Sequence, residues 1–117
     1  MYVYCMKPDA QLFKGSLTTI ILKLLSENER MYGYEITKKV KELTNGSLQL
    51  TEGALYPSLH KLETEGHVKA IIQSIGNRQR KYYKLTPKGK TQVKNKLSEY
   101  ANFLFQMQLL LNLKPAL

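Results

Sequence analysis

Apolar residues recur at helical spacing in two early segments of the chain. The first segment, Leu12 to Glu27, has a wide apolar stripe, which predicts a central helix that contacts several others. The second segment, Met31 to Leu43, predicts a shorter helix with Ile36, Val40 and Leu43 turned inward and a basic outer side. The polar residues 44–47 follow it, and their Asn-Gly pair tolerates the positive φ angles that end a helix.

The stretch from Leu50 to Gly66 predicts a third helix with two different faces. Leu55, Leu59 and Leu62 fall at i, i+4 and i+7, which places them on one stripe. Thr51 is expected to cap the start, and the final glycine to close the end in a left-handed conformation. The other face offers small, aromatic and basic groups: Thr51, Glu52, Gly53, Tyr56, Pro57, His60 and Lys61. A helix that enters the DNA major groove needs this arrangement, although an ordinary amphipathic helix with a solvated face also fits.

The hydrophobic period changes after this helix. His67 to Ile75 is rich in β-branched residues and Lys81 to Leu85 alternates in character, which predicts the two strands of a β-hairpin. We expect the tip, Gly76 to Lys81, to be a flexible basic loop. A loop of this kind directly after a reader helix, meaning the helix that enters the major groove, is called a wing and contacts DNA. The alternative is that the loop is only the solvated end of a hairpin.

A long helix is predicted at the end of the chain, from Thr86-Pro87 to about Leu113, with Pro115 as its stop. Its apolar seam steps by four and three residues, as in a heptad repeat: Val93, Leu97, Tyr100, Leu104, Met107 and Leu111. A helix of about 27 residues is about 40 Å long, too long to be covered by so small a body. We expect its first part to pack on the first helix and its seam to pair across a homodimer.

Charge adds a partner class to this picture. The 117 residues suit one domain, and the net charge is +9. No acidic residue lies between Glu65 and Glu99, a region that contains nine lysines and arginines. This imbalance favours a polyanionic partner, nucleic acid first and an acidic membrane surface second.

The sequence also gives expectations about the cellular location of the protein and about its first residues. Cys5 is the only cysteine, so no intrachain disulfide can form and a cytoplasmic setting is expected. Met1 to Met6 lacks the features of a signal peptide, and the apolar run 18–25 is too short to span a bilayer. Residues 1–11 predict an arm that docks on a partner subunit, or a frayed end.

The order of elements predicts a mainly α fold with a small β-hairpin. Two short helices joined by a tight polar turn form a helix-turn-helix pattern, and the hairpin adds the wing. We therefore expect an N-terminal arm (1–11), a winged helix-turn-helix DNA-binding domain (12–86) and a C-terminal dimerisation helix (87–117).

Four short motifs in this order resemble the PadR family of bacterial transcriptional regulators. They are YGYE at 32–35, LYP at 55–57, LETEG at 62–66 and RKYYKLT at 80–86, and the resemblance covers roughly Lys14 to Lys90. The single short last helix is similar to the small subfamily. The resemblance implies a dimeric winged-helix repressor of promoters, often those of detoxification or transport genes.

The resemblance also implies an effector. In some small members an aromatic-lined pore at the dimer interface binds flat hydrophobic molecules, and the equivalent aromatic residues here are Tyr100 and Phe103. This chain has no tryptophan, which is a departure from those members.

The expected contacts to double-stranded DNA come from three elements. Thr51, Gly53 and Tyr56 are the candidates for approaching bases. Glu52 is expected either to accept a hydrogen bond from a cytosine amine or to interact with the helix dipole. Pro57 is expected to set the shape of the helix, and Lys61 to contact phosphate. Backbone contacts are expected from the second helix and the wing: Tyr34, Lys38, Arg78, Arg80 and Lys81. A dimer of such units predicts a palindromic operator.

The sequence bears on three other function classes. An enzyme is disfavoured because His60 and His67 have no neighbouring cysteine or paired carboxylates, and no metal site or cofactor is expected. A winged helix that binds RNA or a protein partner is the main alternative, and competition between duplex DNA and RNA separates the two. A basic membrane-surface protein is a third, and would bind liposomes without forming a dimer; no membrane partner is expected.

Overall fold

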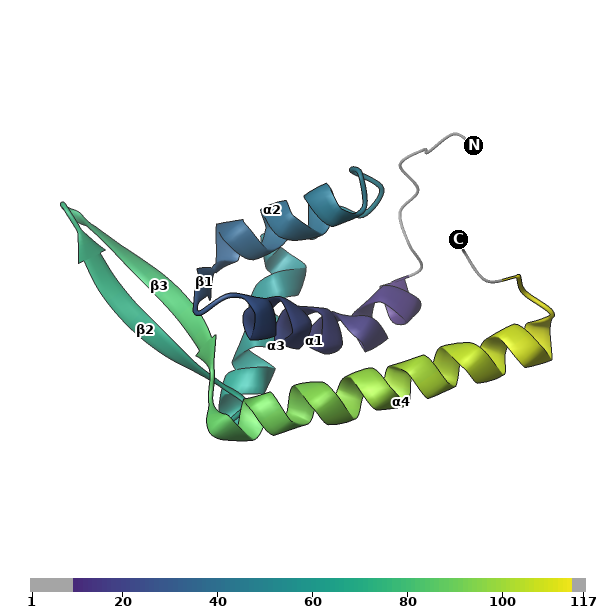
Figure 1. The fold of residues 1–117 in the computed structure, drawn as a ribbon. Coiled ribbons are helices and arrows are strands. Elements are labelled where there is room, and N and C mark those ends of the chain that lie inside the picture. Colours follow the sequence, from purple (N-terminus) through teal and green to yellow (C-terminus); the bar gives the residue numbers. More distant parts are fainter. Residues whose placement is uncertain (1–9, 115–117) are drawn as a thin grey trace.

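The computed structural model describes residues 10–114, which form a four-helix fold with a small sheet at one end (Figure 1). The elements in chain order are α1 (Ala10–Glu27), β1 (Met31–Tyr32), α2 (Gly33–Leu43), α3 (Glu52–Thr64), β2 (Val68–Ile75), β3 (Arg78–Leu85) and α4 (Pro87–Leu111). The first nine residues of the predicted arm and the predicted stop at Pro115 lie outside the described residues. Ala10 and Gln11, which were assigned to the arm, open α1 instead.

Capping residues explain where α3 and α4 begin and where α3 ends. The Thr51 hydroxyl accepts a hydrogen bond from the Ala54 N–H (3.2 Å), which caps α3, and Gly66 follows α3 with a left-handed φ of +81°. Thr86 caps α4 in the same way, with 3.0 Å from its hydroxyl oxygen to the Gly89 nitrogen. Both caps were predicted from sequence and are confirmed, because a cap depends only on residues within one turn.

The sheet differs from the predicted hairpin in two respects. Met31 and Tyr32 do not begin the second helix; they form a short strand opposite Tyr83 and Tyr82, so that the sheet has three strands in the order β1-β3-β2. The prediction of a flexible basic loop from Gly76 to Lys81 is also wrong. Only Gly76 and Asn77 form the turn, and β3 starts at Arg78. Gly76 has a φ of +60°, which suits the first position of a tight two-residue hairpin turn.

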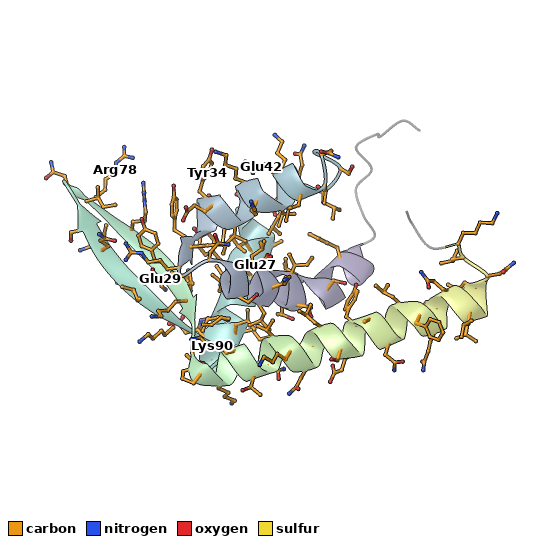
Figure 2. The ribbon with its side chains drawn as sticks, viewed as in Figure 1. Glu27, Glu29, Tyr34, Glu42, Arg78 and Lys90 are labelled. Carbon is orange, nitrogen blue, oxygen red and sulfur yellow. The ribbon has the colours of Figure 1, made fainter. Side chains whose placement is uncertain are left out.

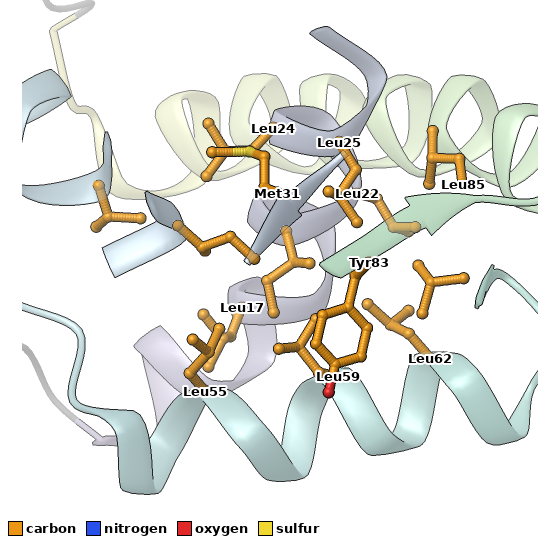
Figure 3. Close-up of a cluster of buried hydrophobic side chains, with 14 of the residues drawn as sticks. Leu17, Leu22, Leu24, Leu25, Met31, Leu55, Leu59, Leu62, Tyr83 and Leu85 are labelled. Atoms are coloured by element: carbon orange, nitrogen blue, oxygen red, sulfur yellow. The ribbon is translucent and has the colours of Figure 1, made fainter. Parts of the chain in front are cut away.

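One apolar core lies between α1, α3 and the inner face of the sheet (Figure 3). The predicted stripe of α3 is fully buried there, with Leu55 and Leu59 at 0% exposure, and Tyr83 of β3 packs into the same cluster. Leu43 was predicted to face inward, but it is 63% exposed, because as the last residue of α2 it lies beyond Val40, where the core ends.

The last helix is only partly covered by its own chain. The first half of α4, as far as Tyr100, packs on α1, and the end of the helix extends past the body of the molecule (Figure 1). Val93 was predicted in the dimer interface, but it is 5% exposed and belongs to the chain's own core. The prediction was wrong at this residue because the heptad count does not show where an internal contact ends. The architecture is a winged helix-turn-helix followed by a long helix.

Candidate nucleic-acid interface

Helix α3 presents a polar and aromatic face to solvent. Its leucine stripe is held by the core, so the opposite side is fixed outward as a rigid surface. All the α3 residues predicted to contact DNA are exposed: Thr51, Glu52, Gly53, Tyr56, Pro57 and Lys61. Pro57 lies inside the helix and removes one backbone hydrogen bond, while the buried leucines hold the helix in place around it.

Tyr56 is positioned by the helix that precedes α3. A β-carbon at Gly33, the first residue of α2, would lie 2.7 Å from the Tyr56 hydroxyl oxygen. The ring therefore leans against the start of α2 in space that only glycine leaves open. The ring remains 45% exposed, so it both contacts α2 and reaches solvent.

The outer side of α2 forms a basic hollow of about 720 Å³. Tyr34 and Lys38, both predicted to contact the DNA backbone, line it together with Lys41, Glu42, Asn45 and Gln49, so two lysines face one carboxylate there. Lys41 and Asn45 were not predicted as site residues. They continue the stripe of Tyr34 and Lys38, because Lys41 follows Lys38 by three residues and Asn45 follows Lys41 by four. A second hollow, of about 620 Å³, lies between α1 and α3 and includes Gly53, Pro57 and Lys61. The first hollow places two lysines at the side of α2, whereas the second is lined mostly by small and apolar residues, with Lys61 as the charged residue of its lining. The hollow on α2 is therefore the one that suits a phosphate ridge.

The wing extends from the body as a regular β-ribbon, with Arg78 near its tip (Figure 2). Strand alternation separates its basic residues, because neighbouring residues of a strand point to opposite faces. Arg78 and Arg80 share a face with Tyr82. Lys81 is on the other face with buried Tyr83, with 5.4 Å from its Nζ to the ring centroid. The three basic residues predicted for the wing therefore do not form one patch.

The Arg80 guanidinium packs on an aromatic ring, a contact that the sequence did not predict. The Arg80 guanidinium carbon lies 4.2 Å from the centroid of the Tyr32 ring, and that of Arg30 lies 4.3 Å from the centroid of Tyr82. The pKa of Arg80 is raised above its ordinary value, first by a hydrogen bond with the Tyr82 side chain, while desolvation opposes the shift. Smaller contributions come from Tyr32 and Tyr82, which are charged phenolates in the high pH range where arginine titrates, and from the Glu35 carboxylate. The alternation of Arg80 and Tyr82 was a visible signal, but the pairing with Tyr32 depends on β1.

The predicted effector residues lie beside a groove between α1 and α4. The groove has a volume of about 480 Å³ and a mostly apolar lining that includes Leu97, Tyr100 and Leu104. The hydroxyl groups of Tyr100 and Ser16 hydrogen-bond, which ties α4 to α1. Phe103 does not line the groove; its ring packs edge-on against Tyr100, with 6.2 Å between centroids.

The described residues contain neither a metal site nor a membrane-spanning helix. Within residues 10–114, no group of three or more histidine, cysteine, aspartate or glutamate side chains is placed to hold a metal ion. No helix in this range is long and apolar enough to cross a bilayer.

Similarity to known proteins decides the family. Residues 21–95 match the model of the transcriptional regulator PadR-like family, and a Lysinibacillus sphaericus protein, itself uncharacterised, is 34% identical over 79% of this chain and 84% of its own length. The chain belongs to the PadR-like family of transcriptional regulators. This confirms the resemblance seen in the four sequence motifs.

Two further relatives of the PadR-like chain are themselves regulators. A transcriptional regulator from Mycobacterium tuberculosis is 33% identical over 60% of this chain, and the match spans 62% of that protein. The solved structure of a transcriptional regulator from Clostridium thermocellum has 31% identity and a TM-score of 0.77, and covers 86% of this chain and 94% of its own. The chain is thus a PadR-like transcriptional regulator with the fold of solved regulators, and the family is not one of enzymes.

Proposed function

We propose that this PadR-like regulator is a homodimer that binds a palindromic operator in double-stranded DNA and represses the promoter there. The observation that carries the proposal is the exposed face of α3. It combines small residues at the N-terminal end, an aromatic side chain and a lysine on a helix whose other face is fully buried. A rigid helix of this kind, beside a basic α2 and a basic wing, is suited to the major groove.

The residues on α3 take different roles in this proposal. Thr51 and Gly53 lie at the N-terminal end, which approaches the base edges, and the missing side chain of Gly53 permits a close approach. Tyr56 reaches a base or the neighbouring sugar-phosphate, and Lys61 contacts phosphate. Glu52 lies in the first turn, where its charge favours the helix dipole and can accept a hydrogen bond from a cytosine amine.

Backbone contacts come from α2 and the wing. Tyr34 and Lys38 line the basic hollow on α2, which fits one phosphate ridge. Arg78, Arg80 and Lys81 follow the wing toward the neighbouring strand or minor groove. Because Lys81 points to the opposite face of the ribbon from the two arginines, the wing can contact DNA along its edge rather than with a single face.

Dimerisation is supported by the apolar surface of α4. Monomers rarely expose this many large apolar side chains on one helix, and they lie on several sides of the second half of α4 and just after it: Phe103, Leu104, Phe105, Leu109, Leu110, Leu111 and Leu113. We propose that the heptad seam pairs with a second copy through Leu97, Tyr100, Leu104, Met107 and Leu111, with Phe103 and Leu110 beside the seam. Two reader helices related by a two-fold axis then meet half-sites about one helical turn, or about 34 Å, apart.

The groove beside Tyr100 supports a finer proposal about regulation. A hydrophobic effector that binds between α1 and α4 acts where the dimer helix joins the DNA-binding body, so it can change the angle between the two reader helices. Release of DNA on titration of the complex with flat hydrophobic compounds is the expected result. A complex that survives saturating amounts of every such compound counts against this part alone.

Footprinting on the protein's own promoter tests the main proposal. We expect two protected half-sites with dyad symmetry, and binding that withstands excess unrelated duplex. Double-stranded RNA of the same sequence serves as the matched competitor, and preference for RNA would favour the alternative. A footprint without dyad symmetry would contradict the dimer model. In this role the protein acts in the cytoplasm, where its operator lies.

A further inference from the structure

Five side chains form an aromatic–arginine cluster at the base of the wing: Arg30, Tyr32, Tyr34, Arg80 and Tyr82. Tyr32 is at the centre. Its ring meets that of Tyr82 edge-on with 5.5 Å between centroids, and stacks with that of Tyr34 at 6.2 Å. Arg80 covers the Tyr32 ring and Arg30 covers the Tyr82 ring.

The backbone of the sheet builds this cluster. Tyr32 and Tyr82 are direct partners in the β1–β3 ladder, so their side chains share a face. Arg80 precedes Tyr82 by two residues and therefore lies on the same face. Tyr34 is in the first turn of α2, and the Glu35 carboxylate oxygen Oε1 accepts a hydrogen bond from the Tyr32 N–H (3.1 Å). The cluster thus connects the wing to the start of α2.

The arrangement leaves most donor groups of Arg80 usable, because the hydrogen bond with Tyr82 occupies only part of the five N–H donors of a guanidinium. Stacking on a ring occupies the flat face of a guanidinium, whereas its N–H donors point outward in the plane. Among residues 10–114 there is no ion pair between a carboxylate and either Arg30 or Arg80. The charge of Arg80 is therefore oriented by rings and is not neutralised by an acid.

We propose that Tyr32, packed edge-on against Tyr82, is a positioning residue for DNA binding, whose ring holds the Arg80 guanidinium so that its N–H edge meets a phosphate of the operator. This inference rests on the proposed function and extends it to residues that touch no DNA in our assignment. A mobile arginine side chain loses conformational entropy when a ligand orders it. A side chain that is already ordered in the free protein avoids this cost on binding, so it contributes more to affinity.

Lys81 provides the matched comparison within the same strand. It is next to Arg80 and also lies near a ring, that of Tyr83, but on the other face of the ribbon and away from Tyr32. Loss of the Tyr32 ring should therefore affect the contribution of Arg80 and not that of Lys81.

A double-mutant cycle with a fluorescent operator duplex at 0.1 M salt tests the coupling. Arg80→Ala should weaken binding about eightfold, which is the loss of one phosphate contact at a slope of about 0.9 per phosphate. Tyr32→Leu should weaken it about fivefold while the salt slope stays unchanged. The double variant should bind within about twofold of Arg80→Ala alone. In the control cycle with Lys81→Ala, the two effects should multiply.

Two conservative variants keep the inference testable if Tyr32→Leu does not fold. Tyr32→Phe keeps the ring and should bind like the wild type. Arg80→Lys keeps the charge but not the planar stack, and should bind about threefold more weakly with an unchanged slope. Multiplicative losses in the Tyr32–Arg80 cycle, or wild-type binding by Arg80→Lys, would overturn the inference and leave the proposed function standing. A wild-type protein that binds no duplex would overturn both.

Discussion

The Tyr56 ring on the reader helix occupies the space that a side chain at Gly33 would need. A β-carbon at Gly33 would lie 2.7 Å from the Tyr56 hydroxyl oxygen and 3.1 Å from the ring carbon Cζ that carries it. One residue opens α2 and the other lies on the exposed face of α3. The contact therefore joins the two helices of the helix-turn-helix at the surface proposed to meet DNA.

Gly33→Ala should displace Tyr56 with little effect on stability. The obstructed group is the end of a half-exposed side chain that can swing outward, and alanine favours a helix by up to about 1 kcal/mol over glycine. We expect the free energy of unfolding to change by less than about 1 kcal/mol. Operator binding should weaken roughly tenfold. Thermal unfolding and duplex titration measure the two effects. Adding Gly33→Ala to Tyr56→Ala should cause no further loss, and additive losses would show that the contact is irrelevant to binding.

Gly89→Ala should destabilise the fold severely. A β-carbon at Gly89 in α4 would lie 2.0 Å from the backbone carbonyl oxygen of His67, which cannot move without disturbing β2. We expect a loss of about 3 kcal/mol or more in chemical denaturation. Gly15→Ala in α1 is the matched control, because nothing lies within 4 Å of its β-carbon position. It should stabilise by about 0.5–1 kcal/mol, and equal behaviour of the two variants would contradict the packing.

Operator affinity should depend steeply on salt. If six phosphates are neutralised, the logarithm of the association constant should fall with the logarithm of salt concentration at a slope of about −5. Lys38→Ala and Arg78→Ala should each make the slope shallower by about 0.9. Lys114→Ala, beyond the end of α4, should leave it unchanged. A wild-type slope near zero would remove the electrostatic basis of the interface.

Leu110→Lys should break the dimer without unfolding the subunit. Leu110 is 74% exposed in the second half of α4, so a charge there is harmless to one chain but is buried unpaired in a dimer. Sedimentation should show a change from twice 13.5 kDa to the single-chain mass. Val93→Ala, at the buried end of the same helix, should instead lower stability by about 2 kcal/mol and keep the dimer. Wild-type protein that sediments as a single chain would contradict the interface.

Local features of the sequence determined most of the elements and the exposed face of α3. The stripe of Leu55, Leu59 and Leu62, the caps at Thr51 and Thr86 and the glycine after α3 each depend on neighbours within one or two turns. Their outcome could therefore be read from spacing alone. The motifs also identified the family, and every predicted site residue on α2 and α3 is exposed.

Tertiary structure alone decided the features that join distant segments. Met31 and Tyr32 continue a helical pattern, but pairing with β3 makes them a strand, and that pairing brings Tyr32 under Arg80. Val93 fits the heptad seam as well as Leu104 does, yet only Val93 is covered by the chain's own core. Local spacing specifies which side chains share a face. What covers that face depends on contacts between residues far apart in the chain, which no local period records.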